Sequence, residues 1–508
     1  MRADYLDSFD FEFEYGLKTL KTEGLVYKNA NHFHANTTTA AGHATLATGT
    51  FPSHSSIVGN DVYNRETNEW EYSILDTSIQ FVGLENCNLE KVSAKNLETY
   101  SIGDHLKIND SESKSYSVAL KDRAAILMGG KNANRAYWFD TESTQMVSSD
   151  YYSSPFPEWV KTFTGKIVMA EEMEYGWEKS ADLQAISTTS PDSFYNETGK
   201  MNAWFPHTLS NFAADVPANK LEGDFLWLTP FGDQFALKFS EQLILNEELG
   251  KDKNCDMLTV GLSSADYIGH HFGPNSLEIL DYYNKLDEYL GSYIQFLDEN
   301  IGKKKYVLVL SADHGVVPFP EISASQGIDA KRISKDRFQS DMSLIDQELQ
   351  VLFNLDQTTF KNISSTGVEP NFEYLTTKNI DSLIYIELLS DLLKNLDYIA
   401  EVYSDFDIYD SSCQKMYIEE MRNSYYSGKN MFVQFISKPY YLINYKQFGT
   451  SHGTPYDYDT RVPLLFYGKG IKPKTVIESV RTVDLAPTVL DILNIEPSLQ
   501  LDGKSLIK

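Results

Sequence analysis

The segment from residue 256 to 310 combines two apolar runs of strand length with one long amphipathic stretch between them. The first run is Asp256 to Ser263 and the second is Tyr306 to Leu310. Between them, Ser276 to Asn300 carries large apolar residues at the three- and four-residue intervals of one helix face. A strand, helix and strand of these lengths predict a right-handed crossover unit of a parallel sheet, and therefore an α/β fold.

Further elements flank this unit. Phe11 to Glu23 reads as an amphipathic helix, Val26 to Phe33 as an extended segment, and Thr37 to Thr48 as a helix that stops at Gly49. Near the end, Val462 to Tyr467 is a strand, in which Pro463 suggests an edge position, and residues 484–493 are a helix.

Two long stretches, about 61–250 and 318–445, have less clear periodicity and more Tyr, Trp, Ser and Asn. We expect them to be insertions that form a cap over the carboxyl ends of the strands. The sequence thus predicts one α/β domain over residues 1–508, interrupted by two cap regions.

Composition limits the function classes. With 72 acidic and 44 basic residues the formal net charge is −28, so a nucleic-acid polymer or an anionic membrane would be repelled over most of the surface. No apolar run approaches the ~18 residues that a membrane span needs. Three cysteines without CxxC spacing predict neither a disulfide framework nor a zinc knuckle: Cys87, Cys255 and Cys413.

Candidate metal ligands follow the predicted strands. Asp266 and His270 are four residues apart, which places them on one face of a helical turn. Asp313 and His314 directly follow the second strand, and His452 lies in a glycine-flanked loop. Each group alone could be an ordinary turn or surface pair. Together, near strand ends where α/β sheets bind ligands, these zinc-type donors predict a two-metal hydrolase.

Other polar residues could bind an anion. Thr39 would start a helix, where the free N–H groups favour an anion, although simple capping explains it equally well. Lys121 and Arg123 lie in the apolar stretch 116–128; on a strand they would share one face, either to bind a phosphoryl group or as solvated charges. Asn60 could be a turn residue or a donor to a substrate oxygen.

These motifs, in this order, resemble the alkaline phosphatase superfamily, and most closely its phosphate-irrepressible alkaline phosphatases, which are kin of the nucleotide pyrophosphatases/phosphodiesterases. The resemblance implies an αβα sandwich with a mostly parallel central sheet. It spans essentially the whole chain and rests on six segments: residues 39–43, 51–60, 121–123, 265–276, 311–315 and 449–453.

The resemblance implies a zinc-dependent phosphate monoester hydrolase that acts through a phospho-threonine intermediate on Thr39. One zinc would be held by Asp266, His270 and His452, and a second by Asp313, His314 and Thr39. Asn60, Lys121 and Arg123 would contact the phosphoryl oxygens, and the Lys–Arg pair marks the monoesterase branch. His43 is expected to be a packing or supporting residue.

Two alternatives stay open: a phosphodiesterase or nucleotide pyrophosphatase, and an inactive truncated relative that only binds phosphate esters. A sulfatase is disfavoured because no Cys-x-Pro-x-Arg or Ser-x-Pro-x-Arg motif occurs. The substrate is expected to be a small phosphate ester. The resemblance further implies a monomer located in the periplasm or secreted.

The start of the chain departs from the family pattern. Family members have a first strand that ends in an Asp ligand of the second zinc, followed by a stretch that Met1 to Leu6 matches. The resemblance therefore implies that the first strand is truncated here and that one of the two zinc sites lacks this Asp. Asp4 matches a later family residue that is not a ligand.

Overall fold

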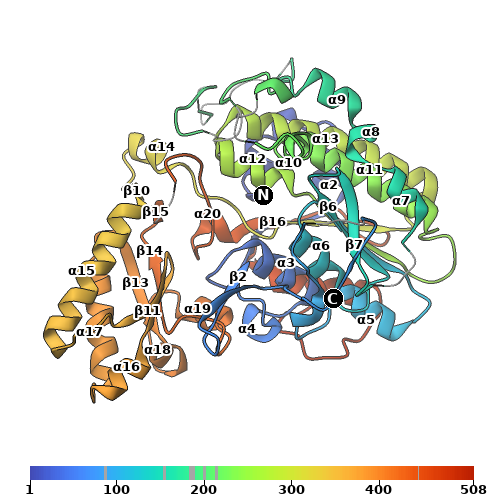
Figure 1. Ribbon diagram of the computed structural model, residues 1–508. Coiled ribbons are helices and arrows are strands. Elements are labelled where there is room, and N and C mark those ends of the chain that lie inside the picture. Colours follow the sequence, from blue (N-terminus) through green and yellow to red (C-terminus); the bar gives the residue numbers. More distant parts are fainter. Residues whose placement is uncertain are drawn as a thin grey trace.

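The computed structural model describes residues 1–84, 88–152, 156–181, 183, 189–190, 192–197, 202–211, 216–443 and 446–507. Cys87 lies outside these residues. The chain forms a large α/β body and a smaller lobe beside it (Figure 1). None of the described helices is long and apolar enough to cross a membrane.

Two five-stranded sheets form the centre of the α/β body. One has the order β17-β1-β16-β9, with β18 also paired to β1; its strands are Lys474–Val476, Leu25–Asn31, Arg461–Gly468, Val307–Ser311 and Val480–Arg481. The other has the order β4-β7-β6-β5-β8, with strands Phe81–Val82, Gln145–Ser149, Arg135–Asp140, Ser115–Ala119 and Met257–Gly261.

Parallel and antiparallel pairs both occur in these sheets. β5 pairs in parallel with β6 and β8, and β1 pairs in parallel with β17 and β18. β16 is antiparallel to both β1 and β9, and β7 is antiparallel to β6 and β4. Both central sheets are therefore mixed, whereas the sequence predicted a mostly parallel sheet.

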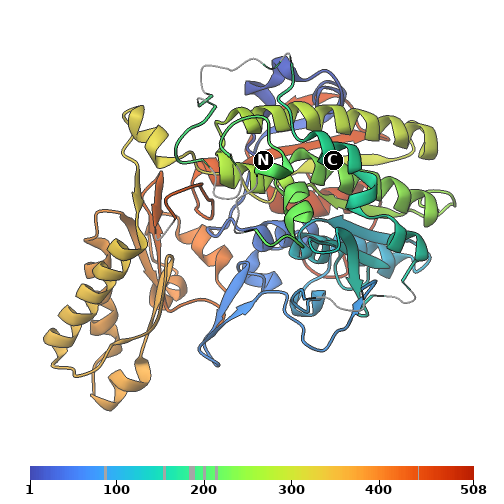
Figure 2. The same cartoon turned by 45° about the horizontal axis from the view of Figure 1, so that its top comes forward.

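Helices cover both faces of the sheet region, as expected for an αβα sandwich. α2 (Gly16–Glu23), α11 (Pro230–Asn246) and α13 (Leu277–Leu297) pack together on one face (Figures 1 and 2). The other face is covered by α3 (Thr39–Thr48), α5 (Ile102–Asn109), α6 (Asp122–Gly129) and α21 (Leu485–Ile492). Fully buried side chains such as Leu17, Phe235 and Leu280 fill the first layer.

The predicted strand–helix–strand unit is present as β8, α13 and β9, with α12 (Ser264–Phe272) inserted before α13. However, β8 pairs only with β5 and β9 only with β16, and no backbone pairing joins β8 to β9 within the described chain. The residues of both strands are mostly half-buried, whereas those of β5 are fully buried. The sheet is therefore interrupted between β8 and β9.

Pro463 does not mark an edge strand, because β16 is paired on both sides. The register between β1 and β16 shifts between Tyr27 and Ala30, whose partners Leu464 and Val462 flank Pro463. This irregularity accommodates the missing N–H of the proline within an internal strand. The helix expected over 11–23 is also interrupted: a short 3₁₀ turn, Asp10–Glu12, precedes α2.

The stretch 61–250 is more than a cover, since it supplies β5, β6 and β7 to the sheet beside β8. It also carries a hairpin of β2 (Asp61–Asn64) and β3 (Glu69–Tyr72). The second stretch contains the outer lobe, residues 335–437, with the sheet β11-β12-β14-β13 and its own apolar cluster. Its main elements are α15 (Lys335–Phe353), α17 (Ser382–Lys394), β11 (Phe360–Ser364), β12 (Gly367–Pro370), β13 (Ile399–Ser404) and β14 (Val433–Ser437).

Shorter elements complete the described chain. They are α1 (Tyr5–Ser8), α4 (Pro52–Ser55), α7 (Glu158–Thr162), α8 (Gly165–Val168), α9 (Ala170–Tyr175), α10 (Leu221–Trp227), α14 (Pro320–Ser325), β10 (Lys331–Ile333), α16 (Phe372–Thr377), α18 (Asp405–Tyr409), α19 (Ile418–Ser424), β15 (Tyr441–Ile443) and α20 (Asp457–Thr460), with brief 3₁₀ or π turns at 94–96, 209–211, 298–302 and 482–484.

Candidate active site

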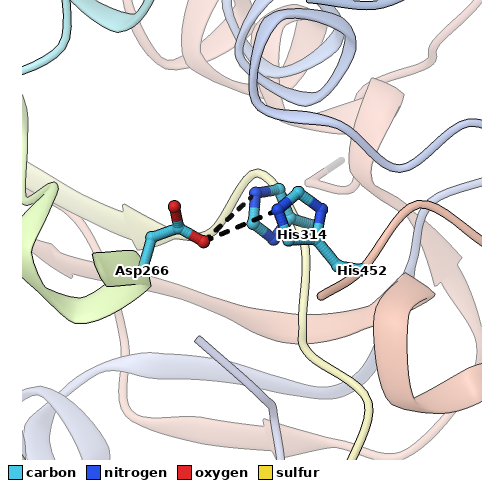
Figure 3. A group of neighbouring side chains, drawn as sticks. All are labelled: Asp266, His314 and His452. Atoms are coloured by element: carbon cyan, nitrogen blue, oxygen red, sulfur yellow. Dashed lines mark ion pairs between the residues drawn. The ribbon is translucent and has the colours of Figure 1, made fainter. Parts of the chain in front are cut away.

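A carboxylate and three histidines meet where β8 and β9 end. Asp266 and His270 lie on α12 directly after β8, and His314 lies three residues after β9. Asp266 Oδ1 is 3.4 Å from His270 Nε2, 3.6 Å from His452 Nε2 and 3.9 Å from His314 Nε2. Figure 3 shows Asp266 facing the rings of His314 and His452. The predicted ligands thus converge from three distant segments.

Backbone carbonyls orient the imidazoles. The Nδ1 atom of His270 lies 2.6 Å from the carbonyl oxygen of Thr450. The Nδ1 atom of His452 lies 2.7 Å from that of Thr37, and the Nδ1 atom of His314 lies 2.8 Å from that of Gly315. With Nδ1–H donating to these carbonyls, each Nε2 presents its lone pair to the site, as metal-binding histidines do.

The donor set fits a divalent metal ion. One donor atom each from Asp266, His314 and His452 lies within 4.8 Å of the others. His314 Nε2 is buried and lies 3.2 Å from Asp313 Oδ2 and 3.9 Å from Asp266 Oδ1, and the rings of His314 and His452 stack with centroids 3.4 Å apart. Imidazole nitrogens and carboxylate oxygens are donors that zinc prefers, so the residues present suit an ion of zinc type.

Asp313 lies beside this cluster. Its Oδ2 is 3.2 Å from His314 Nε2 and 3.2 Å from His43 Nδ1. His43 Nδ1 is also 2.8 Å from the Thr39 carbonyl oxygen. His43 therefore joins the first turn of α3 to a candidate metal ligand, a role that the sequence indicated only as general support.

The local charges favour the ionised acids. Burial opposes ionisation of Asp266, but the charges of His270 and Lys121 hold the pKa of its carboxyl well below the ordinary value. Burial likewise opposes ionisation of Asp313, and His314 and His43 hold its pKa well below the ordinary value. Burial and the neighbouring His314 lower the pKa of His452, which leaves this imidazole neutral and able to bind a cation.

Thr39 is the first residue of α3 and is buried. Its Oγ1 lies 3.5 Å from Lys121 Nζ. One turn later, a side chain at Gly42 would come within 2.1 Å of the Asp313 carbonyl oxygen, so only glycine lets α3 approach the loop after β9 this closely. Asn60 Oδ1 accepts the N–H of Ala40 at 2.9 Å, which places Asn60 at the same helix N-terminus.

Lys121 and Arg123 are not on a strand. β5 ends at Ala119, Lys121 caps α6, and Arg123 lies in the first turn of that helix. Lys121 Nζ contacts the Asp266 carboxylate closely and lies 4.8 Å from the centre of the Tyr267 ring. Arg123 Nη1 donates to the Tyr72 hydroxyl at 3.3 Å, and its Nε is buried without a hydrogen-bond partner. The helix start, rather than a strand face, brings both cations to the site.

The amino group of Met1 is also buried here. It donates to the His314 carbonyl oxygen at 2.9 Å and feels the charges of Asp313 and Asp266, while burial lowers its pKa. Asp4 is bound by Arg2 at 2.7 Å.

Comparison with known proteins identifies similar chains. Residues 1–362 match the model of the type I phosphodiesterase / nucleotide pyrophosphatase family. The chain is 34% identical to a "Calcium-transporting ATPase" of Myroides odoratus and 32% identical to "Alkaline phosphatase PafA" of Elizabethkingia meningoseptica; each alignment covers 98% of this chain and 90% of the relative. The crystal structure of alkaline phosphatase PafA matches with a TM-score of 0.90 at 30% identity, covering 100% of this chain and 96% of that one.

Proposed function

Because this chain belongs to the type I phosphodiesterase / nucleotide pyrophosphatase family within the alkaline phosphatase superfamily, we propose that it is an alkaline phosphatase that hydrolyses phosphate monoesters. The observation that carries the proposal is the buried Thr39 hydroxyl at the start of α3, 3.5 Å from Lys121 Nζ and beside the Asp266 and His314 cluster. This arrangement unites a nucleophile, a cation and candidate metal donors.

Thr39 is the proposed nucleophile, which takes the phosphoryl group as a phospho-threonine intermediate. Asp266, His270 and His452 would hold one zinc, and Asp313, His314 and Thr39 would hold the second. His314 Nε2 lies near the carboxylates of both sets, 3.2 Å from Asp313 Oδ2 and 3.9 Å from Asp266 Oδ1. When bound, zinc would supply Lewis-acid activation of the attacking and leaving oxygens. His43 would hold the Asp313 carboxylate in position relative to the first turn of α3.

The cations beside Thr39 would bind the non-bridging phosphoryl oxygens. Lys121 and Arg123 supply positive charge where negative charge develops, and the N-terminus of α3, with Asn60 next to it, adds N–H donors. Supporting this role, a variant of alkaline phosphatase PafA with a solved structure carries substitutions of Thr, Asn, Lys and Arg in that chain order. The proposed residues here have the same types and order.

The two cations favour a monoesterase over the phosphodiesterase named in the family description. A phosphate monoester carries more negative charge on its non-bridging oxygens than a diester does, so it gains more from Lys121 and Arg123. A comparison of kcat/KM for an aryl phosphate and its methyl diester decides between them, and a higher value for the diester would contradict our proposal.

The direct test is phosphate release from p-nitrophenyl phosphate in the presence of zinc, with and without a chelator. Thr39→Ala should lower kcat by about 10³-fold or more, since it removes the hydroxyl that we propose as nucleophile. Thr45→Ala is the matched control, because Thr45 is buried on the same helix and its Oγ1 has no hydrogen-bond partner. Ordinary turnover by Thr39→Ala would refute the assignment of Thr39 as nucleophile. Inactivity of the wild-type chain would refute the phosphatase and favour the inactive binder.

The remaining expectations extend this proposal. We propose a small phosphate ester as substrate, two zinc ions per chain, and a monomer that acts in the periplasm or outside the cell. We also propose one domain over residues 1–508 with covering regions within 61–250 and 318–445. Metal analysis, sedimentation and cell fractionation test these points separately.

A further inference from the structure

A cavity of about 710 Å³ opens beside the two cations of the site. Its inner end is formed by Lys121, Asp122 and Arg123, at the start of α6. Its outer wall is the β2–β3 hairpin together with Leu89, Glu90 and Trp227. The cavity therefore adjoins the two cations that we propose to bind the phosphoryl oxygens.

The cavity is bipolar. Two cations, Lys121 and Arg123, share the inner end with Asp122, and four further carboxylates line the cavity: Asp61, Glu69, Glu71 and Glu90.

Two of these acids are already engaged. Asp122 accepts from the Tyr72 hydroxyl at 2.6 Å, and Glu71 accepts from Asn64 at 2.7 Å. Glu69 and Glu90 are exposed, and neither forms an ion pair with a described residue. Negative charge at the outer end is therefore uncompensated, and a second anionic group of a substrate would be repelled there.

Aromatic rings lie among these carboxylates. Trp70 of β3 is 45% exposed, an unusual position for a tryptophan, and its ring centroid is 5.6 Å from that of Tyr63. Trp227 lines the same cavity from the end of α10. Indole faces next to carboxylates are a favourable environment for an ammonium group, which binds through cation–π and ionic attraction together.

From this charge pattern we propose that the cavity is a leaving-group subsite that selects phosphate monoesters of cationic alcohols, such as choline or ethanolamine, over neutral or polyanionic leaving groups. The proposal rests on the phosphatase function proposed above. It assigns the phosphate end of a zwitterionic substrate to Lys121 and Arg123, and the ammonium end to Trp70 and Glu69.

The test uses two esters of the same shape and different charge. Phosphocholine and dimethylbutyl phosphate, in which carbon replaces the ammonium nitrogen, should differ by about tenfold in kcat/KM in favour of phosphocholine. The preference should shrink at high salt, because part of it is ionic. Equal kcat/KM values for the two esters would overturn the subsite.

Two variants locate the preference. Glu69→Gln should reduce the ratio toward one and leave kcat/KM for dimethylbutyl phosphate unchanged, because a neutral group gains nothing from the carboxylate. Trp70→Ala should also reduce the ratio, because the indole face attracts the ammonium more strongly than its neutral isostere. Glu66→Gln, on the exposed turn of the same hairpin and outside the cavity lining, is the control and should keep the ratio.

The outcomes separate the two proposals. A preference that survives in both cavity variants would overturn the subsite, as would a loss in the Glu66→Gln control. Turnover of both esters without preference overturns the subsite and leaves the phosphatase intact. Absence of turnover of either ester and of p-nitrophenyl phosphate overturns both.

Discussion

At the scale of single residues, His43 connects two parts of the candidate site, although it is not itself a proposed metal ligand. Its Nδ1 lies within reach of both Asp313 and the Thr39 carbonyl oxygen. It therefore couples a candidate ligand to the residue that we propose as nucleophile. Partners of this kind typically contribute 10- to 100-fold to metal affinity.

We predict that His43→Ala lowers zinc affinity by about 10- to 100-fold, since Asp313 loses the group that orients it. His43→Asn keeps an N–H donor near the position of Nδ1 and should recover part of that affinity. Zinc titration with a competing chelator measures the effect. His54→Ala, which removes an exposed histidine paired with Asp502, should leave the affinity unchanged; an equal loss there would contradict the specific role.

The residues of the candidate site were largely predictable because motif and local element coincide. Asp266 and His270 lie one turn apart on α12, and Thr39 starts α3, as the spacing predicted. Lys121 and Arg123 show the limit. The run Tyr116 to Met128 is mainly apolar on both sides of its central charged residues, and such a run does not reveal where a strand ends and a helix begins. The partners of His43 and Tyr72 are tertiary contacts, for which the sequence carries no local signal.

At the scale of elements, α12 is held in place by a carboxylate of another helix. Asp233 of α11 accepts the N–H of Ser264 at 3.1 Å and the hydroxyl of Tyr282 at 2.6 Å. Burial raises the pKa of Asp233 to about 6, although these hydrogen bonds oppose the shift. The folded protein thus binds a proton at Asp233 more tightly than the unfolded chain does.

From this shift we predict that Asp233 weakens the fold as pH rises. Its stabilising protonation is complete below about pH 4, the ordinary value for an Asp, and is lost as pH passes through about 6. Asp233→Asn keeps the shape without the titration, so its stability should vary less between pH 4 and pH 6 than that of the wild type. Urea unfolding at several pH values measures this difference, and parallel curves for the two proteins would count against it.

Elements with clear periodicity were predicted well, including α13, β9, β16 and α21. The pairing of strands was not. Pro463 favoured an edge, yet β16 is internal because a register shift opposite the proline removes the need for its N–H. Within the stretch 61–250, the run 116–128 was considered as a strand and contains most of β5, but β6 and β7 were not predicted, because short strands resemble loop segments when no partner strand is known.

At the scale of the whole molecule, the outer lobe is joined to the α/β body through a buried ion pair. Arg65, at the β2–β3 hairpin, binds Asp405 of the lobe with two hydrogen bonds of 2.5 and 2.9 Å, and its Nε also donates to the Asn430 carbonyl oxygen. The exposed fractions of the two side chains are only 19% and 10%, so removal of one partner leaves a largely buried charge.

We predict that Arg65→Ala destabilises the protein by about 3 kcal/mol, because Asp405 loses its charged partner in a buried setting. Arg337→Ala is the comparison, since Arg337 pairs with Asp341 and Asp397 while half exposed and should cost less than about 1 kcal/mol. Thermal or urea unfolding of the three proteins measures both values. Similar losses in the free energy of unfolding for the two variants would show that the Arg65–Asp405 pair stabilises the protein no more than an exposed ion pair does.

The interruption between β8 and β9 divides the candidate metal donors. Asp266 follows β8 and His314 follows β9, and no backbone pairing of these two described strands ties the two sides together. The zinc that we propose for Asp266, His270 and His452 would then link the side of β8 to the side of β9 and β16, because His452 lies in the segment before β16. Binding of metal would then also stabilise the fold where the backbone pairing of the strands is interrupted.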